Sequence, residues 1–238
     1  MCKISNSKAS ITAKLSDAVF ELVPAHPAAQ EALQLALASS SQSIINHSFR
    51  TYLYAQAFSA FPETAKARDS FHTLQPVFFE PYVLFVACIL HDVAITEEYD
   101  LVPERFEIVS AGIAIKLLRR HGVEESILRD VWLAMAIHAT PGVAEHYGGA
   151  VGAMRLAILV EFGGLSVPLH LMSEPYRNVI CEGFLLPRLG IEKGLGDAVA
   201  RQGRKDRTKA PPATWAGLMT LSSLENPEWN GVNKAFHL

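Results

Sequence analysis

The pair His91-Asp92 ends a nearly unbroken apolar run, residues 83–90, and constrains the fold more than any other feature of the chain. So apolar a run is expected to form a buried helix, which carries an imidazole and a carboxylate to the edge of the core. Burying either group without a partner is costly. A divalent metal ion would compensate both, because histidine nitrogen and carboxylate oxygen are its commonest ligands other than sulfur. The alternative is a histidine that simply ends a helix favourably.

Three other apolar segments carry a similar interruption. His47 lies in the amphipathic stretch 45–52, His138 ends another apolar helical run, and Glu161 is the one carboxylate in residues 158–164. A buried polar side chain nearly always has a hydrogen-bond partner, so four separate interruptions would need four separate partners. The pattern therefore favours one shared polar site.

Four motifs resemble those of a known family. They are Asn46-His47-Ser48 with Arg50 and Tyr52, Leu90-His91-Asp92-Val93, Arg105-Phe106-Glu107 with Gly112, and Trp132 with Ile137-His138 and Thr140-Pro141-Gly142. In order and spacing they resemble the HD-domain superfamily of metal-dependent enzymes, most closely its cyanamide hydratase-like branch, over residues 46–164. The resemblance implies an all-α HD-domain helical bundle. It also implies one divalent metal ion, held by His47, His91, Asp92 and a last carboxylate, here Glu161.

The chain departs from that family at two positions. The family usually has aspartate where this chain has Glu161, and many relatives have glycine where it has Ala94. Glutamate carries the same carboxylate on a side chain one methylene longer. Glu161 could therefore reach the metal, or it could lie behind a ligand.

Composition bounds the class of protein. Half of the 238 residues are hydrophobic, which is enough for one sizeable domain and argues against disorder. We expect a single HD-type domain over residues 1–238, with a core at about 40–165, a helical N-terminal extension and a C-terminal elaboration. The net charge of −3 gives no general electrostatic reason to bind nucleic acid or an acidic membrane surface. No apolar run approaches the ~20 residues that span a membrane. Three scattered cysteines fit a reducing compartment, so a cytoplasmic protein is expected.

Helical periodicity dominates the chain. It predicts helices over residues 11–22, 41–61, 81–90, 124–138, 150–161, 176–186 and 191–200, with Pro27 opening one more and Pro103 opening another that stops near Gly122. Residues 92–102 are expected to form a connecting loop. The basic stretch 201–209 is expected to be a solvated loop, with a phosphate-contacting arm as the alternative. No segment reads convincingly as a strand, so the predicted class is all-α.

The leading functional hypothesis is a metal-dependent hydratase. Metal-activated water would add to the carbon of a small nitrile-like or cyanamide-like substrate. Asp92 is the candidate proton acceptor and His138 the candidate shuttle to the substrate nitrogen, because histidine commonly transfers protons near neutral pH. Arg50, Glu107 and Thr140 are candidates for contacting the substrate or orienting a ligand, although Glu107 could equally form an ion pair with an arginine and Thr140 could cap a turn. The donor set suits zinc, iron or manganese, and the resemblance implies zinc.

Three other functions fit the same residues. A phosphohydrolase would need cations for the phosphate, and Arg50 and Lys116 are the candidates near the motifs. A dinuclear iron oxygenase would need further histidine ligands, for which His121 and His138 are available between the paired motif and the last carboxylate. A degenerate relative, weakened by Glu161, would bind a ligand or a partner. A homodimer that pairs through the partly apolar residues 165–169 is a further expectation of this kind.

Overall fold

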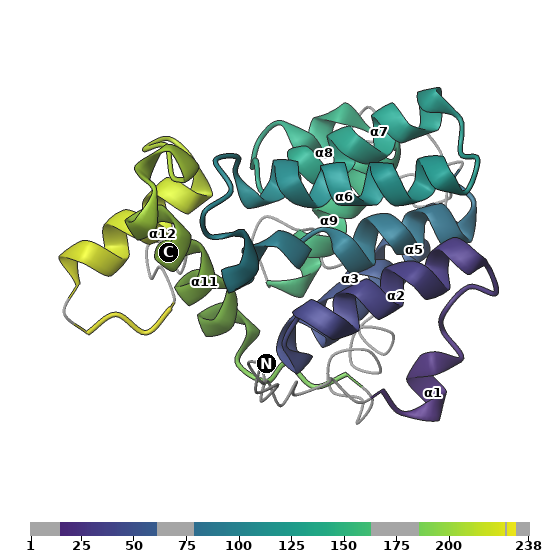
Figure 1. Cartoon of the computed structure of the whole chain (residues 1–238), viewed down its shortest axis with the longest axis horizontal. Coiled ribbons are helices and arrows are strands. Elements are labelled where there is room, and N and C mark those ends of the chain that lie inside the picture. Colours follow the sequence, from purple (N-terminus) through teal and green to yellow (C-terminus); the bar gives the residue numbers. More distant parts are fainter. Residues whose placement is uncertain (1–14, 61–78, 163–185, 227, 232–238) are drawn as a thin grey trace, which may run out of the picture.

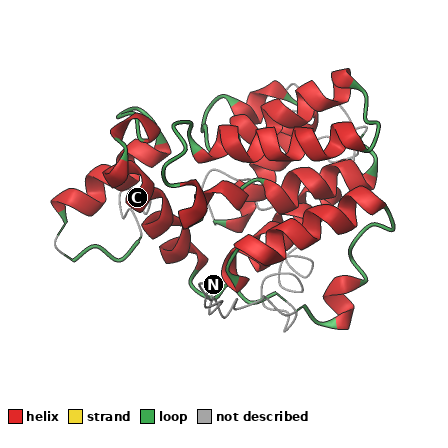
Figure 2. Cartoon of the chain, in the orientation of Figure 1, coloured by secondary structure: helices red, strands yellow, loops and turns green. Residues whose placement is uncertain are grey.

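The computed structural model describes residues 15–60, 79–162, 186–226 and 228–231. Within those ranges every regular element is a helix and there is no strand (Figure 2), which confirms the predicted all-α class. The helices are α1 (Asp17–Phe20), α2 (Pro27–Ser39), α3 (Gln42–Ala60), α5 (Pro81–Leu90), α6 (Phe106–Arg120), α7 (Glu125–Ala136), α8 (Ala144–Tyr147), α9 (Gly149–Glu161), α11 (Ile191–Lys205) and α12 (Trp215–Glu225). Short 3-10 helices, η1 (Val93–Ile95), η2 (Glu97–Tyr99) and η4 (Arg207–Lys209), connect some of them.

Local sequence signals place several of the boundaries. Pro27 and Pro81 stand in the first turns of α2 and α5, where a missing backbone N–H costs nothing. The predicted helix start at Pro103 is wrong, because α6 begins at Phe106. Arg105 precedes α6 in an extended conformation, with ψ of 151°, so Pro103 lies in the bend before the helix rather than within it.

The helix α5 lies inside the main bundle (Figure 1), and this position explains its apolar sequence. It packs against α2, α3, α6 and α7, and every residue from Val83 to Leu90 is buried. The Phe85 ring is perpendicular to that of Tyr52, with ring centroids 5.1 Å apart. A helix covered on all sides needs no polar face. The polar groups of this segment therefore come where the helix ends, at His91 and Asp92.

The helices α11 and α12 lie together at one end of the molecule (Figure 1) and share a smaller apolar core with the bundle. Gly203 lies inside α11, although the sequence predicted an interruption of the helix there. A Cβ atom at residue 203 would lie 2.1 Å from the hydroxyl oxygen of Thr220 in α12. Glycine costs about 1 kcal/mol in a helix relative to alanine. Residue 203 must nevertheless be glycine, because α12 approaches too closely to leave room for a side chain.

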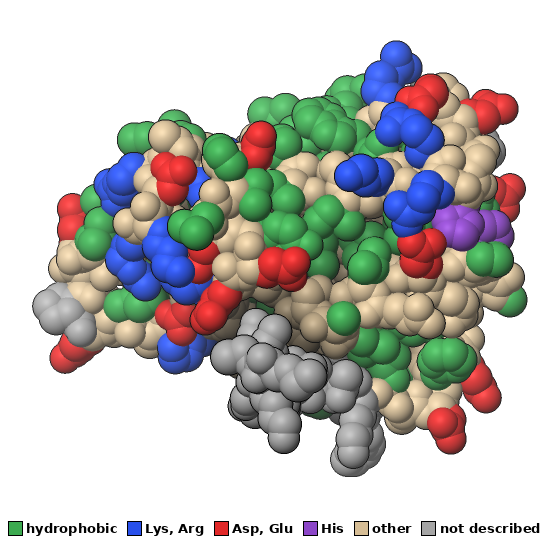
Figure 3. All heavy atoms as spheres, viewed as in Figure 1, with side chains coloured by type: hydrophobic (Ala, Val, Ile, Leu, Met, Phe, Trp, Pro, Cys, Tyr) green, Lys and Arg blue, Asp and Glu red, His purple; other side chains and the backbone are tan. Residues whose placement is uncertain are grey.

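The basic stretch 201–209 is not the solvated loop that the sequence predicted. Its first half completes α11, and its second half forms η4. Arg201 and Lys205 both pair with the buried Asp100, at 3.0 and 2.7 Å, and Lys209 donates to the carbonyl oxygen of Tyr99 at 2.7 Å. Figure 3 shows the Lys and Arg side chains gathered at this end of the molecule with acidic side chains beside them. The charges are therefore used to attach α11 to the segment that follows Asp92.

Some predictions fall outside the described residues. These are the first part of the helix predicted over residues 11–22, the helix predicted over 176–186, and the dimer contact predicted at 165–169. No helix among the described residues has both the length and the apolar character needed to cross a membrane.

Candidate metal centre

Three ligand-type side chains converge inside the bundle. His47 projects from α3, His91 caps the C-terminus of α5, and Asp92 follows directly. The Nε2 atom of His91 lies 3.1 Å from Nε2 of His47 and 3.1 Å from Oδ2 of Asp92, while His47 Nε2 lies 3.5 Å from the same oxygen. All three side chains are buried. We call these three residues the His-His-Asp cluster.

The hydrogen-bond network assigns the proton of the His91 ring. The Nδ1 atom of His91 lies 2.6 Å from the carbonyl oxygen of Cys88. A carbonyl oxygen can only accept, so Nδ1 carries the hydrogen and Nε2 of the neutral ring presents a lone pair to the cluster. Burial lowers the pKa of His91, and the neighbouring imidazoles of His47 and His138 lower it further, against the opposing effect of Asp92. The neutral form of His91 is therefore favoured.

The cluster brings hydrogen-bond acceptor atoms close together. Their mutual repulsion must be compensated either by a proton on His47 or by a bound cation. Burial alone would lower the pKa of His47, but the carboxylates of Asp92 and Glu161 raise it above its ordinary value. Burial alone would raise the pKa of Asp92, but the three surrounding histidines hold it well below its usual range. Neutral imidazole nitrogens beside an ionised carboxylate are a donor set that divalent metal ions take. The cluster could therefore hold a metal ion.

Three helix C-termini meet around these residues. The helix α5 ends directly before His91, α7 ends two residues before His138, and α9 ends on Glu161. The carbonyl end of a helix carries a partial negative charge, worth about 0.3–1 kcal/mol to a nearby cation. The backbone therefore adds to the attraction that the carboxylates exert on a cation.

His138 shares Asp92 with the cluster. Its Nε2 atom lies 3.5 Å from Asp92 Oδ1, whereas the two cluster histidines approach Oδ2. Its Nδ1 atom lies 2.6 Å from the carbonyl oxygen of Met135, so this ring also turns Nε2 toward the site. Arg155 donates to the carbonyl oxygen of His138 at 3.2 Å and is itself paired with Glu145 at 2.8 Å. This buried ion pair holds the backbone from which His138 projects.

Glu161, which the sequence predicted as the fourth ligand, approaches His47 at its other ring nitrogen. Its Oε1 atom lies 3.4 Å from His47 Nδ1, whereas His91 faces Nε2. Arg50 donates from Nε to both carboxylate oxygens, at 3.0 and 2.9 Å. Burial alone would raise the pKa of Glu161, but Arg50 and His47 lower it to about 2. Glu161 is thus an ionised neighbour of the cluster and is not among the three residues whose donor atoms lie together.

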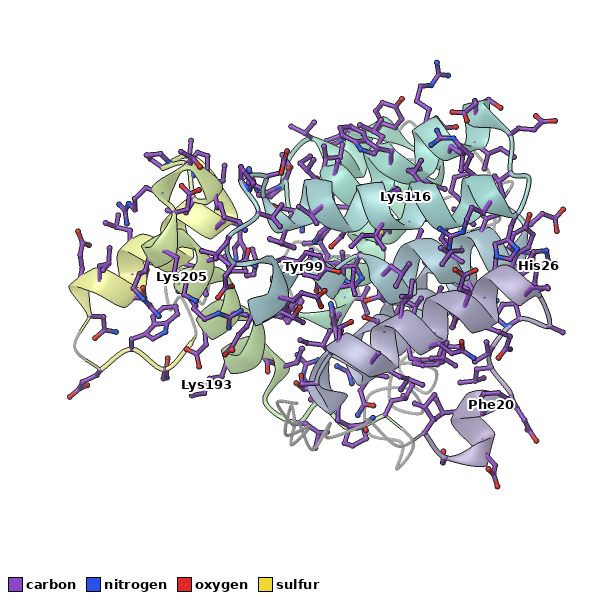
Figure 4. All side chains as sticks on the ribbon, viewed as in Figure 1. Phe20, His26, Tyr99, Lys116, Lys193 and Lys205 are labelled. Carbon is purple, nitrogen blue, oxygen red and sulfur yellow. The ribbon has the colours of Figure 1, made fainter. Side chains whose placement is uncertain are left out.

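The described contacts of the other predicted residues, Glu107, Thr140 and Lys116, lie outside the cluster. Glu107 is buried at the start of α6 and pairs with Arg105, whose Nε atom donates to Glu107 Oε2 at 3.3 Å. Thr140 is exposed in the turn after α7, where its backbone N–H donates to the carbonyl of Ile137 at 2.8 Å. Lys116 projects from α6 into solvent (Figure 4). Among the described residues, none of Glu107, Thr140 and Lys116 forms a hydrogen bond or ion pair with the cluster.

A surface hollow of about 450 Å³ lies between the start of α3, the 3-10 helices η1 and η2, and α11. Its lining includes Ile44, Ile95 and Arg201, but none of the three cluster residues. The hollow therefore does not mark the place where a substrate would meet the cluster.

Two residues that support the site escaped the reasoning from sequence. Arg155 interrupts the apolar helix α9 just as Glu161 does, so the same signal could have found it. Arg188 contacts Glu161 Oε1 at 3.3 Å and donates to the Glu161 carbonyl oxygen at 2.6 Å. No local pattern marks Arg188, because it follows the end of the motifs and reaches the site through tertiary contact.

A comparison with protein-family models gives no match for this chain, and a comparison with curated protein sequences gives none either. The HD-domain resemblance therefore remains a prediction from the motifs. The candidate metal centre rests on its geometry.

Proposed function

We propose that this protein is a metal-dependent hydratase that adds water to a small neutral substrate of the nitrile or cyanamide type. One observation carries the proposal, namely the convergence of two imidazole Nε2 atoms and a carboxylate oxygen in a buried site. His47, His91 and Asp92 would hold the metal, with zinc as our first expectation and iron or manganese as the others. A bound zinc ion lowers the pKa of a coordinated water to about 7, which makes hydroxide available at neutral pH.

The residues of the chain would manage the protons. Hydration of a nitrile forms a bond from the water oxygen to carbon and moves both protons of that water to nitrogen, which gives an amide, or urea from cyanamide. The site therefore needs a proton acceptor and a proton donor. Asp92 Oδ1 is the acceptor that we assign, because the cluster histidines approach the other oxygen. His138 Nε2 lies 3.5 Å from Asp92 Oδ1 and would pass the proton to the nitrogen.

The charges around the cluster favour a neutral substrate over a phosphate ester. Phosphoryl transfer relies on cations that stabilise the phosphate oxygens. In the part of the chain that the structure describes, the arginines around the cluster are already paired. Arg50 and Arg188 contact Glu161, and Arg155 contacts Glu145. A phosphohydrolase therefore ranks second.

The test begins with the metal content of the purified protein and of two variants. We expect close to one metal ion per chain in the wild type, loss of that ion in His91→Ala, and no change in His146→Ala, which removes an exposed histidine of α8. The metal-loaded protein is then offered cyanamide and a panel of nitriles, and the amide or urea product is quantified.

Each outcome assigns a different class. Hydration products that require the metal support the proposal. Phosphate release from a phosphate ester offered in parallel, without hydration of the nitriles and at full metal content, would move the assignment to a phosphohydrolase. Two irons per chain would favour an oxygenase, and a protein that takes up no metal would be a ligand-binding protein.

A further inference from the structure

Glu161 and the His-His-Asp cluster occupy different edges of the His47 ring. His47 Nε2 faces His91 Nε2 at 3.1 Å, and His47 Nδ1 faces Glu161 Oε1 at 3.4 Å. The two nitrogens of an imidazole direct their hydrogen or lone pair along strongly diverging lines. An ion bound at Nε2 and a carboxylate resting against Nδ1 are therefore on different sides of the ring.

The position of His47 within its helix explains why its Nδ1 atom needs the Glu161 carboxylate as an acceptor. His91 and His138 each place Nδ1 2.6 Å from the carbonyl oxygen three residues earlier. Both carbonyls belong to the last turn of a helix, where they have no intrahelical partner. The equivalent carbonyl for His47 is that of Ile44, which lies in the first turn of α3 and is used within the helix. His47 Nδ1 is buried and makes no hydrogen bond with any described residue, so Glu161 is the acceptor within reach.

Arg50 holds the Glu161 carboxylate in that place. Its Nε atom donates to both oxygens, and its Nη2 atom pairs with Oε1. Arg50 is itself fully buried and anchored, because its Nη1 atom donates to the carbonyl oxygen of Leu186 at 2.8 Å. Arg188 adds a contact with Oε1 at 3.3 Å. Both oxygens therefore accept from a guanidinium, and Oε1, the oxygen next to His47, already contacts two arginines.

We propose that Glu161 is a positioning residue for His47 rather than the fourth metal ligand, and that Arg50 keeps it in place. It would accept the Nδ1 hydrogen of His47, which fixes the ring orientation and leaves the Nε2 lone pair for the metal. All three histidines of the site would then share one tautomer. The inference rests on the proposed metal centre, and it predicts that the metal keeps its protein ligands when Glu161 is changed.

Cobalt(II) is the probe that separates a positioning residue from a ligand. The wild type and the variants Glu161→Gln, Glu161→Ala and His91→Ala are titrated with Co²⁺ against a competing chelator, and the visible spectrum is recorded at saturation. Glu192→Gln is the matched control. Glu192 also pairs with an arginine, Arg188, but both side chains of this pair are partly exposed. We expect Glu161→Ala to bind Co²⁺ about 10–100-fold more weakly with unshifted absorption bands. Glu161→Gln should lose less, because its amide oxygen still accepts. His91→Ala should lose the bands, and Glu192→Gln should match the wild type.

Loss or displacement of the bands in Glu161→Gln would overturn the proposal, because it would mean that a ligand had been removed. A wild type that takes up no Co²⁺ would instead overturn the metal centre, and with it the proposed function. Nuclear magnetic resonance of the wild type with ¹⁵N-labelled histidine gives a reading that needs no variant. His47 should keep its hydrogen on Nδ1 while the Nε2 resonance moves on addition of Zn²⁺, and a metal-induced shift at Nδ1 would contradict the assignment.

Discussion

Replacing Arg50 with methionine would leave the Glu161 carboxylate buried without its main cation. Methionine retains an unbranched apolar side chain of similar length but no charge. Arg50 is completely buried and contacts both carboxylate oxygens as well as a backbone carbonyl of the segment before α11. The change therefore tests whether a buried ion pair ties α3 to the C-terminus of α9.

The magnitude follows from the contacts that are lost. Removing one partner of a buried ion pair costs about 3–5 kcal/mol, and the lower figure applies because Arg188 Nη1 stays 3.3 Å from Glu161 Oε1. The carbonyl oxygen of Leu186 loses its hydrogen bond from Arg50, at a cost of about 1 kcal/mol. The expected loss in the free energy of unfolding is about 4 kcal/mol. With an m-value of about 3 kcal/mol per molar, the urea midpoint should fall by about 1.3 M.

A double-mutant cycle with Glu161→Gln provides the decisive comparison. Arg50→Met leaves the buried Glu161 carboxylate with Arg188 alone, and Glu161→Gln leaves the buried Arg50 without a carboxylate. Arg50→Met combined with Glu161→Gln removes both buried charges. The double variant should therefore lose at least about 2 kcal/mol less than the sum of the two single losses. Urea unfolding is followed by far-ultraviolet circular dichroism and by tryptophan fluorescence, whose transitions should coincide. Single losses that add to within about 0.5 kcal/mol would refute the reasoning, since independent sites behave in that way.

Two further predictions concern residues away from the cluster. Asp100→Asn is expected to lower the free energy of unfolding by about 1–3 kcal/mol, because Arg201 and Lys205 lose the anion that they share. Burial alone would raise the pKa of Asp100, but hydrogen bonds from Arg201 and Lys205 lower it. The wild type should therefore exceed the variant in free energy of unfolding by its full margin above the unfolded pKa of about 3.9, and this margin should shrink as the pH falls further. Urea midpoints measured against pH check the sign, and a difference that grows in acid would contradict it. Burial also raises the pKa of the Cys88 thiol, so iodoacetamide should alkylate Cys88 only after unfolding. Peptide mapping by mass spectrometry reads this out, and rapid labelling of the native protein would disagree with the burial.

The helices that the sequence predicted correctly are those with local signals. Pro27 and Pro81 mark the starts of α2 and α5, and the apolar run before His91 corresponds to a helix covered by neighbours. The errors lie where tertiary contact overrides local preference. Gly203 reads as a helix breaker, yet it lies within the last turn of α11 and permits the close approach of α12.

The same division holds for the candidate site. His47, His91, Asp92 and Glu161 can be found from the sequence, because each is a ligand-type side chain in an apolar segment, and such groups must share compensation once buried. The chain order of these segments says nothing about which edge of an imidazole a neighbouring helix will face. The packing of α3 against both α5 and α9 settles that point, since it turns His47 Nε2 toward His91 and Nδ1 toward Glu161.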